Sequence, residues 1–266
     1  MALDSLYSAL AAVYLAAGVY IYVALLRQIR HRVPEQLANP VRSFGWPEAI
    51  LASFLVLFFL YAMAASASRS VSGIQTPDLL QSAVLSIGLL LFIAGFLRIR
   101  RLDLNLLGGF SKMSFSRAVA TGAILLLAAY PLVLLAEVVT QKLSRGSMEK
   151  QGIIELFTAS GALEQRIMII LLAVMVAPLA EEFFFRFFLY GVLRQYFGRA
   201  IGVMFSALLF AAVHAHLPSF APLFVLGVCF TLAYEWSGSL LVSMTMHALF
   251  NAFALTALAF PEVIPQ

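Results

Sequence analysis

Two adjacent carboxylic acids stand in the middle of a long apolar stretch of this chain. They are Glu181 and Glu182, and Arg186 follows four residues after the second. A charged side chain at the centre of a membrane helix costs roughly 2.5 to 3.5 kcal/mol, so such residues are kept for function or for mutual pairing. Later apolar segments add His214, His247 and Asn251. Because carboxylates and imidazoles are the usual general acids and bases, we expect one active site within the membrane.

The spacing of the three charged residues predicts a division of roles. Residues four apart lie on one face of a helix, so Glu182 and Arg186 can form an ion pair. Glu181 projects about 100° away from Glu182 and stays available as an acid or a base. The structural alternative is an ion pair with a boundary glutamate, in which RFFLYGVLRQYFGR would be an interfacial helix beyond the membrane.

A second group lies in the segment FSALLFAAVHAHL. Phe210 and His214 are four residues apart and share a face of the expected helix. His216 is rotated from His214 by about 200°, so the two histidines cannot face one cavity. We select His214, because His216 adjoins LPSF at the expected end of the span. A lone buried histidine is otherwise an ordinary core residue.

The third group is His247 and Asn251, which are again four residues apart in SMTMHALFNAF. They share a face and offer a ring and an amide donor toward one point. Two fixed donors suit the oxyanion that forms when a peptide carbonyl is attacked. Interhelical hydrogen bonding is the alternative, since Asn and His often make such bonds in membrane bundles.

Composition predicts the scaffold that must hold these groups. The 266 residues are 62% hydrophobic and only 11% charged, with a mean hydropathy of +0.96. Soluble domains carry about 25% charged residues, and lipid admits only helices and closed barrels. The continuous apolar runs favour an all-α, polytopic membrane helix bundle. We expect one domain over 1–266, with N-terminal helices over 1–140 and a catalytic core over 165–260.

About eight transmembrane helices are expected. Their ranges are 6–26, 47–66, 79–97, 118–139, 167–193, 199–216, 221–235 and 239–259. The seventh is short and follows two prolines, which suggests a tilted or partly re-entrant helix. At 1.5 Å per residue, Glu181 and His214 lie roughly 20 and 22 Å from the same membrane side. His247 lies only roughly 12 Å from it, nearer the mouth unless helix tilt closes the gap.

Charge distribution predicts the orientation. The connections after the first, third and fifth spans hold 11 basic residues, and the opposite connections hold 5. The positive-inside rule then puts both termini outside and the site opening toward the cytoplasm. The net charge of +4 is spread over these connections, so we expect no nucleic-acid partner. The IIELF segment suggests a short interfacial helix, and the N-terminal stretch a retained first span rather than a signal peptide.

The cysteine content limits which bonds and metal sites the chain can form. The only cysteine, Cys229, lies in an apolar segment, which excludes an intramolecular disulfide and a thiolate metal cluster. The C-terminal VIPQ lacks the cysteine of a prenylation substrate. We expect no metal and no cofactor.

At these motifs the sequence resembles the CPBP family, which contains CAAX prenyl proteases and Abi bacteriocin-immunity proteins. EEFFFR at 181–186 resembles the family's EExxxR motif, FAAVH at 210–214 its FxxxH motif, and HALFN at 247–251 its HxxxN motif. The resemblance implies a glutamate-dependent intramembrane endopeptidase without a metal. Glu181 and His214 would activate a water, His247 and Asn251 would stabilise the oxyanion, and Glu182 with Arg186 would organise the site. It covers about residues 165–260.

Two rival functions stay open. A zinc protease would need ligands from three helices, and the chain has no HExxH motif. A non-enzymatic membrane protein, either a proton-coupled transporter or an immunity factor that binds a partner, suits intramembrane acids and histidines equally well. The expected partners are the lipid bilayer and a protein or peptide substrate, for which a prenylated CAAX tail is one candidate. In a prokaryote the location would be the inner or plasma membrane.

Overall fold

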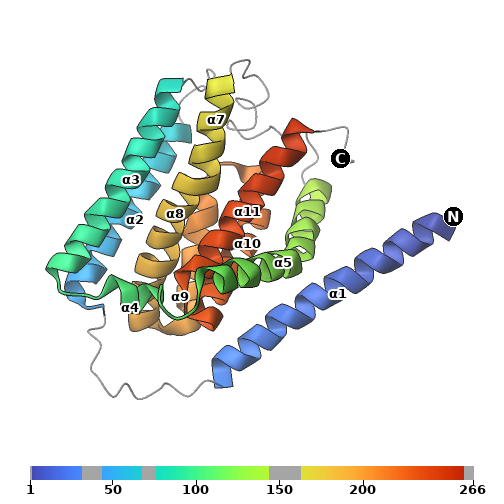
Figure 1. Cartoon of the computed structure of the whole chain (residues 1–266), viewed down its shortest axis with the longest axis horizontal. Helices are drawn as coiled ribbons and strands as arrows, with labels where there is room; N and C mark the ends of the chain where they lie inside the picture. The colour runs from blue at the N-terminus through green and yellow to red at the C-terminus, as the bar shows by residue number, and fades with distance from the viewer. Residues whose placement is uncertain (1, 32–43, 68–75, 144–162, 261–266) are drawn as a thin grey trace.

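The computed structural model describes residues 2–31, 44–67, 76–143 and 163–260, and these residues form helices joined by short connections (Figure 1). Seven of the described helical stretches are long and apolar enough to cross a membrane. The predicted all-α membrane bundle is therefore confirmed. The IIELF segment lies outside the described residues.

The elements follow the predicted apolar runs closely. They are α1 (Ala2–His31), α2 (Trp46–Ala67), α3 (Thr76–Ile99), α4 (Leu104–Gly108), α5 (Phe115–Leu143), α7 (Leu163–Leu171), the π-helix η1 (Leu172–Val176), α8 (Ala177–Glu182), the π-helix η2 (Phe183–Leu189), α9 (Tyr190–Val213), the 3₁₀-helix η3 (Leu217–Ser219), α10 (Phe220–Ser237) and α11 (Leu240–Ala259). The predicted short seventh span is α10, an 18-residue continuous helix that begins directly after η3.

Gly198 explains why eight predicted spans appear as seven continuous stretches. The helical run over Leu163–Val213 is interrupted at Gly198, whose φ of 81° and ψ of 172° are non-helical. A positive φ is accessible to glycine without steric cost. The chain reverses there, because Ser206 Oγ donates to the Phe185 carbonyl at 2.7 Å and the rings of Phe185 and Phe210 lie 5.4 Å apart. The predicted spans 167–193 and 199–216 are thus two antiparallel helices.

Helix α1 docks on a proline in α5. Pro131 lies inside α5 and has no N–H to donate to the carbonyl of Leu127, four residues before it. Tyr14 of α1 fills that role, since its hydroxyl donates to the Leu127 carbonyl at 2.6 Å. Gly18 permits the approach, because a Cβ there would lie 2.5 Å from the Ala128 carbonyl oxygen. In a membrane each backbone carbonyl needs such a partner, so the proline supplies a specific contact between the two helices.

The run from Phe183 to Leu189 lies at the centre of the bundle. Every residue of this run is buried, which requires neighbours on all sides of the helix. The surrounding elements α2, α3, α10 and α11 supply them, and one core joins residues of both halves of the chain, among them Tyr22, Ile93 and Phe230. The two carboxylates directly precede this run, so the sequence places them in the interior.

One edge of the bundle gathers the C-terminal end of α1, the α3–α4 connection and the turn at Gly198 (Figure 1, lower edge). Glu235 at the end of α10 organises part of this edge. Its carboxylate pairs with Arg194 at 2.7 Å and Arg199 at 2.9 Å, and accepts a hydrogen bond from Tyr190. The predicted cytoplasmic side corresponds to this edge. The orientation in a cell stays a prediction.

Candidate active site

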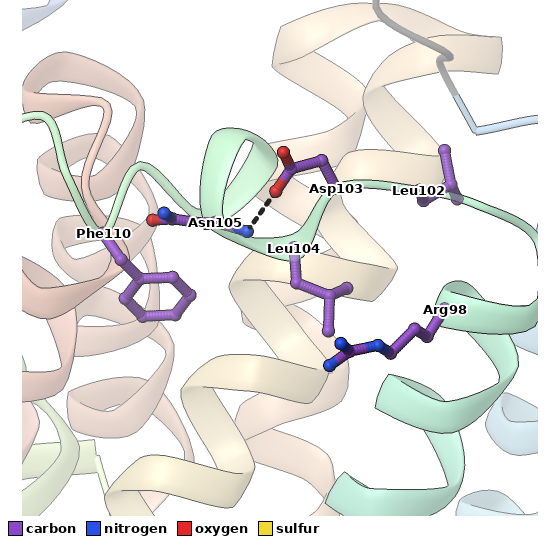
Figure 2. Close-up of a pocket in the computed structure, with 6 residues that line it drawn as sticks. All are labelled: Arg98, Leu102, Asp103, Leu104, Asn105 and Phe110. Atoms are coloured by element: carbon purple, nitrogen blue, oxygen red, sulfur yellow. Dashed lines mark hydrogen bonds between the residues drawn. The ribbon is translucent and has the colours of Figure 1, made fainter.

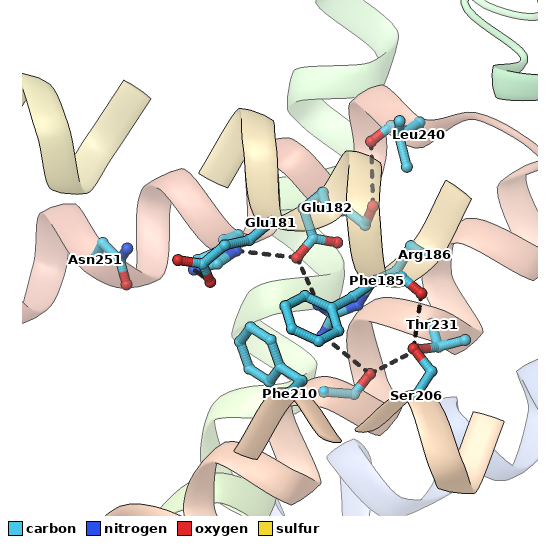
Figure 3. Close-up of polar contacts among 12 residues, drawn as sticks. Glu181, Glu182, Phe185, Arg186, Ser206, Phe210, Thr231, Leu240 and Asn251 are labelled. Atoms are coloured by element: carbon cyan, nitrogen blue, oxygen red, sulfur yellow. Dashed lines mark hydrogen bonds and ion pairs between the residues drawn. The ribbon is translucent and has the colours of Figure 1, made fainter. Parts of the chain in front are cut away.

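The two glutamates point to different surroundings. Figure 3 shows Glu182 turned toward Arg186, and Glu181 turned away from that pair toward the side on which Asn251 lies. The Glu182 side chain is fully buried, whereas that of Glu181 is 30% exposed. The predicted division between a paired and an accessible carboxylate is present in the structure.

The ion pair is completely enclosed. Nη1 of Arg186 lies 3.1 Å from Oε1 of Glu182, and both side chains are 0% exposed. The guanidinium carbon lies 4.2 Å from the ring centroid of Phe210 and 5.2 Å from that of Phe230. A desolvated cation over an aromatic face gains about 2 kcal/mol. This contact helps to offset burial, because Nε and Nη1 of Arg186 have no hydrogen-bond partner among the described residues and only Nη2 donates, to the Gly227 carbonyl at 3.4 Å.

His247 bridges the two glutamates. Its Nδ1 lies 3.0 Å from Oε1 of Glu182, and its Nε2 lies 3.9 Å from Oε2 of Glu181. The straight-helix depth estimate, which put His247 nearer the membrane surface than Glu181, is wrong. Part of the reason is that the π-helix η2 separates the glutamates from the membrane edge, and a π-helix rises less per residue than the assumed α-helix.

His214 approaches Glu181 from the other helix of the hairpin. Its Nε2 lies 4.0 Å from Oε2 of Glu181, and its Nδ1 lies 2.7 Å from the Phe210 carbonyl. His216 instead contacts Ser219 through Nδ1 at 2.8 Å. Of the contacts that the structure gives for these two histidines, the one to Glu181 is made by His214. Phe210 packs its ring against His214, with centroids 4.8 Å apart, and against His247 at 5.7 Å.

Asn251 is held differently from the expectation. It follows His247 by one turn of α11, but its Nδ2 donates to the carbonyl of Ala173 in η1 at 2.7 Å. One of its two N–H donors is therefore engaged by the backbone, and the pair of donors does not converge on one point as simply as i, i+4 spacing suggests.

Three supporting residues were not identified from the sequence. The Phe230 ring lies 5.2 Å from that of His247 at a tilt of 30°, and it also borders Arg186. Ser206 and Thr231 donate to the carbonyls of Phe185 and Gly227, which flank Arg186. In sequence they are ordinary members of apolar spans. Ser206 is the exception, because it precedes Phe210 by four residues and such spacing places both on one face of a helix.

A pocket of about 550 Å³ lies elsewhere, at the end of α3 and around α4 (Figure 2). Its lining residues are Arg98, Leu102, Asp103, Leu104, Asn105 and Phe110. Asp103 caps α4 by accepting from the backbone amides of Asn105 and Leu106. None of the acid–base residues named above lines this pocket.

The comparison with protein families bears on the same segment. Residues 163–253 match the Rce1-like family of type II CAAX prenyl endopeptidases. All seven residues selected from the sequence fall within this range, and the family resemblance is confirmed for it. No curated protein and no solved structure matches the chain. The family supports a protease role and a peptide as substrate. The apolar helices support an integral membrane protein, with the lipid bilayer as its surrounding.

Proposed function

We propose that this chain is an intramembrane endopeptidase of the CAAX-protease type, with Glu181 as general base to a hydrolytic water. The observation that carries the proposal is the position of Oε2 of Glu181, 3.9 Å from Nε2 of His247 and 4.0 Å from Nε2 of His214. These separations exceed direct hydrogen bonds, and the buried Oε2 has no hydrogen-bond partner among the described residues, so we propose that a water links it to Nε2 of His214.

His214 is assigned as the second acceptor for that water. Its Nδ1 faces the carbonyl oxygen of Phe210, which can only accept, so the ring proton resides on Nδ1. In the neutral ring Nε2 then carries a lone pair. The water donates one hydrogen to Glu181 and the other to His214, which orients its oxygen for attack.

His247 is assigned as an oxyanion donor. Oxygen Oε1 of Glu182 pairs with the Arg186 cation and lies 3.0 Å from Nδ1 of His247; a carboxylate oxygen can only accept, so Nδ1 carries a hydrogen. Nε2 can donate only when the ring is an imidazolium. The proposal therefore requires a charged His247 held by Glu182. A preorganised charged donor in a water-poor site stabilises the tetrahedral oxyanion more than the same donor in water.

The hydrolytic step follows from these assignments. Glu181 takes a proton from the water as its oxygen bonds to the peptide carbonyl carbon, and the carbonyl oxygen becomes the oxyanion beside His247. The second amide hydrogen of Asn251, beyond the one given to Ala173, is a further candidate donor to that oxygen. Collapse breaks the C–N bond, and the protonated Glu181 returns its proton to the leaving amine.

The substrate class is proposed from the setting of the site. An acid–base site within membrane helices suits a peptide held near the membrane, and a prenylated CAAX tail meets that condition. The opening is proposed to face the cytoplasm, from the excess of basic residues on that side.

The test is cleavage of a farnesylated CAAX peptide by purified protein in detergent or proteoliposomes, beside the same peptide without the prenyl group. Glu181→Gln keeps size and hydrogen bonding but removes the base, so we expect the rate to fall by a factor of about 10² to 10⁴. Glu164→Gln, the same change on exposed α7, is the matched control and keeps the wild-type rate. Retention of more than a tenth of the rate by Glu181→Gln refutes the assignment.

A further inference from the structure

The hydrogen bond from Asn251 to Ala173 compensates for a missing backbone hydrogen bond in the helix before the two glutamates. In η1 the amide of Ala177 donates to the carbonyl of Leu172, five residues earlier, and so is not available to the carbonyl of Ala173. The next amide in that pattern would belong to residue 178. This residue is Pro178, which has no N–H.

The carbonyl of Ala173 is therefore left without either of its usual helical donors. Ala173 is buried, and a buried carbonyl in an apolar surrounding needs a partner. Nδ2 of Asn251 supplies it at 2.7 Å, from a separate helix. The same arrangement occurs in α5, where Pro131 leaves the Leu127 carbonyl to Tyr14.

The location of this contact connects it to the site. Only α8, of six residues, separates the π-turn from Phe183, and its last two residues are the glutamates. Successive residues of a helix are rotated by about 100°, so a change between π and α pairing in η1 would rotate both carboxylates relative to α11. On α11, Asn251 holds η1 and His247 contacts Glu182, one helical turn apart.

We propose that Pro178 and Asn251 act together as a positioning device for the two glutamates. Pro178 leaves a carbonyl of the π-turn without a backbone donor, and the Asn251 amide binds that carbonyl. This contact fixes the helix in the rotation that directs Glu181 and Glu182 toward His247. Asn251 is in this respect a positioning residue, in addition to the oxyanion role under the proposed function. Of the measurements below, only those of activity rest on the proposed function.

Replacing Pro178 distinguishes the two roles of Asn251. Pro178→Ala restores a backbone N–H that can satisfy the carbonyls of the turn. If Asn251 positions the glutamates, Asn251→Ala should be far less harmful in the Pro178→Ala background than in the wild type. If it only donates to the oxyanion, the loss of kcat is the same in both backgrounds.

The decisive measurement uses the enzyme without substrate, where no oxyanion exists. The chain has four histidines, so ¹⁵N-histidine spectra of the full-length protein in micelles resolve few rings. We expect Asn251→Ala to shift or broaden the His247 Nδ1–H signal, and the double change Pro178→Ala/Asn251→Ala to restore it. An unchanged signal in Asn251→Ala, or a changed one that the double change does not restore, overturns the proposal.

Activity supplies a parallel measurement. We expect the loss of kcat from Asn251→Ala to be at least tenfold smaller with Pro178→Ala present, with KM little changed. Equal losses overturn positioning. If the wild type cleaves no peptide, the proposed function fails while the spectra still test the device. If Pro178→Ala cannot be purified in folded form, Asn251→Gln is used in its place. The glutamine amide still reaches toward the Ala173 carbonyl, so this variant should keep the wild-type His247 signal. Loss of that signal overturns the proposal.

Discussion

Replacing Arg186 tests whether the buried ion pair is a unit. Glu182 and Arg186 are both 0% exposed, with Nη1 and Oε1 3.1 Å apart. Breaking a buried pair from one side costs about 3 to 5 kcal/mol, because an uncompensated charge remains. For Arg186→Met we expect the lower end, about 3 kcal/mol, since His247 Nδ1 still faces Glu182 at 3.0 Å. Glu182→Gln should fall at the upper end, because the guanidinium then keeps only the Gly227 carbonyl at 3.4 Å and the aromatic faces, with no opposite charge.

The double change Glu182→Gln/Arg186→Met removes both charges and keeps similar volumes. It should therefore be more stable than Glu182→Gln, which requires a coupling of more than about 3 kcal/mol, roughly 150-fold in the unfolding equilibrium. The assay is unfolding in mixed micelles, followed by helical circular dichroism as SDS is added. Arg194→Met is the matched control, since Arg194 is 45% exposed and such pairs contribute about 0 to 1 kcal/mol. A double variant that is no more stable than Glu182→Gln refutes the pairing argument.

Three further outcomes are expected. Cys229→Ser keeps peptide cleavage in the farnesyl-peptide assay, because Cys229 is buried and is not among the residues around Glu181; a loss of turnover in folded protein would point to thiol chemistry. Cleavage survives a strong chelator, because the proposed mechanism activates the water with Glu181 and His214 alone; stoichiometric zinc with loss on chelation and recovery on zinc addition would replace the mechanism. A topology reporter fused after residue 266 reads as non-cytoplasmic, following the basic-residue count, and a cytoplasmic signal reverses the assigned orientation.

Local properties of the chain were readable from the sequence alone. Transfer of apolar side chains into lipid depends on composition over about 20 residues, so the helices of the bundle follow from the apolar runs. The pairing of Glu182 with Arg186 also follows from local geometry, because residues four apart meet on any α-helix. The break at Gly198 was visible as the gap between two expected spans.

Tertiary structure decided how the helices present their polar groups to one another. The sequence could not show that His247 lies between both glutamates, that Phe230 borders His247 and Arg186, or that Asn251 closes the turn before Pro178. These contacts depend on the rotation and depth of α11 and α10 against the hairpin. The π-turns change both quantities by departing from 3.6 residues per turn, and a periodicity argument assumes that value throughout.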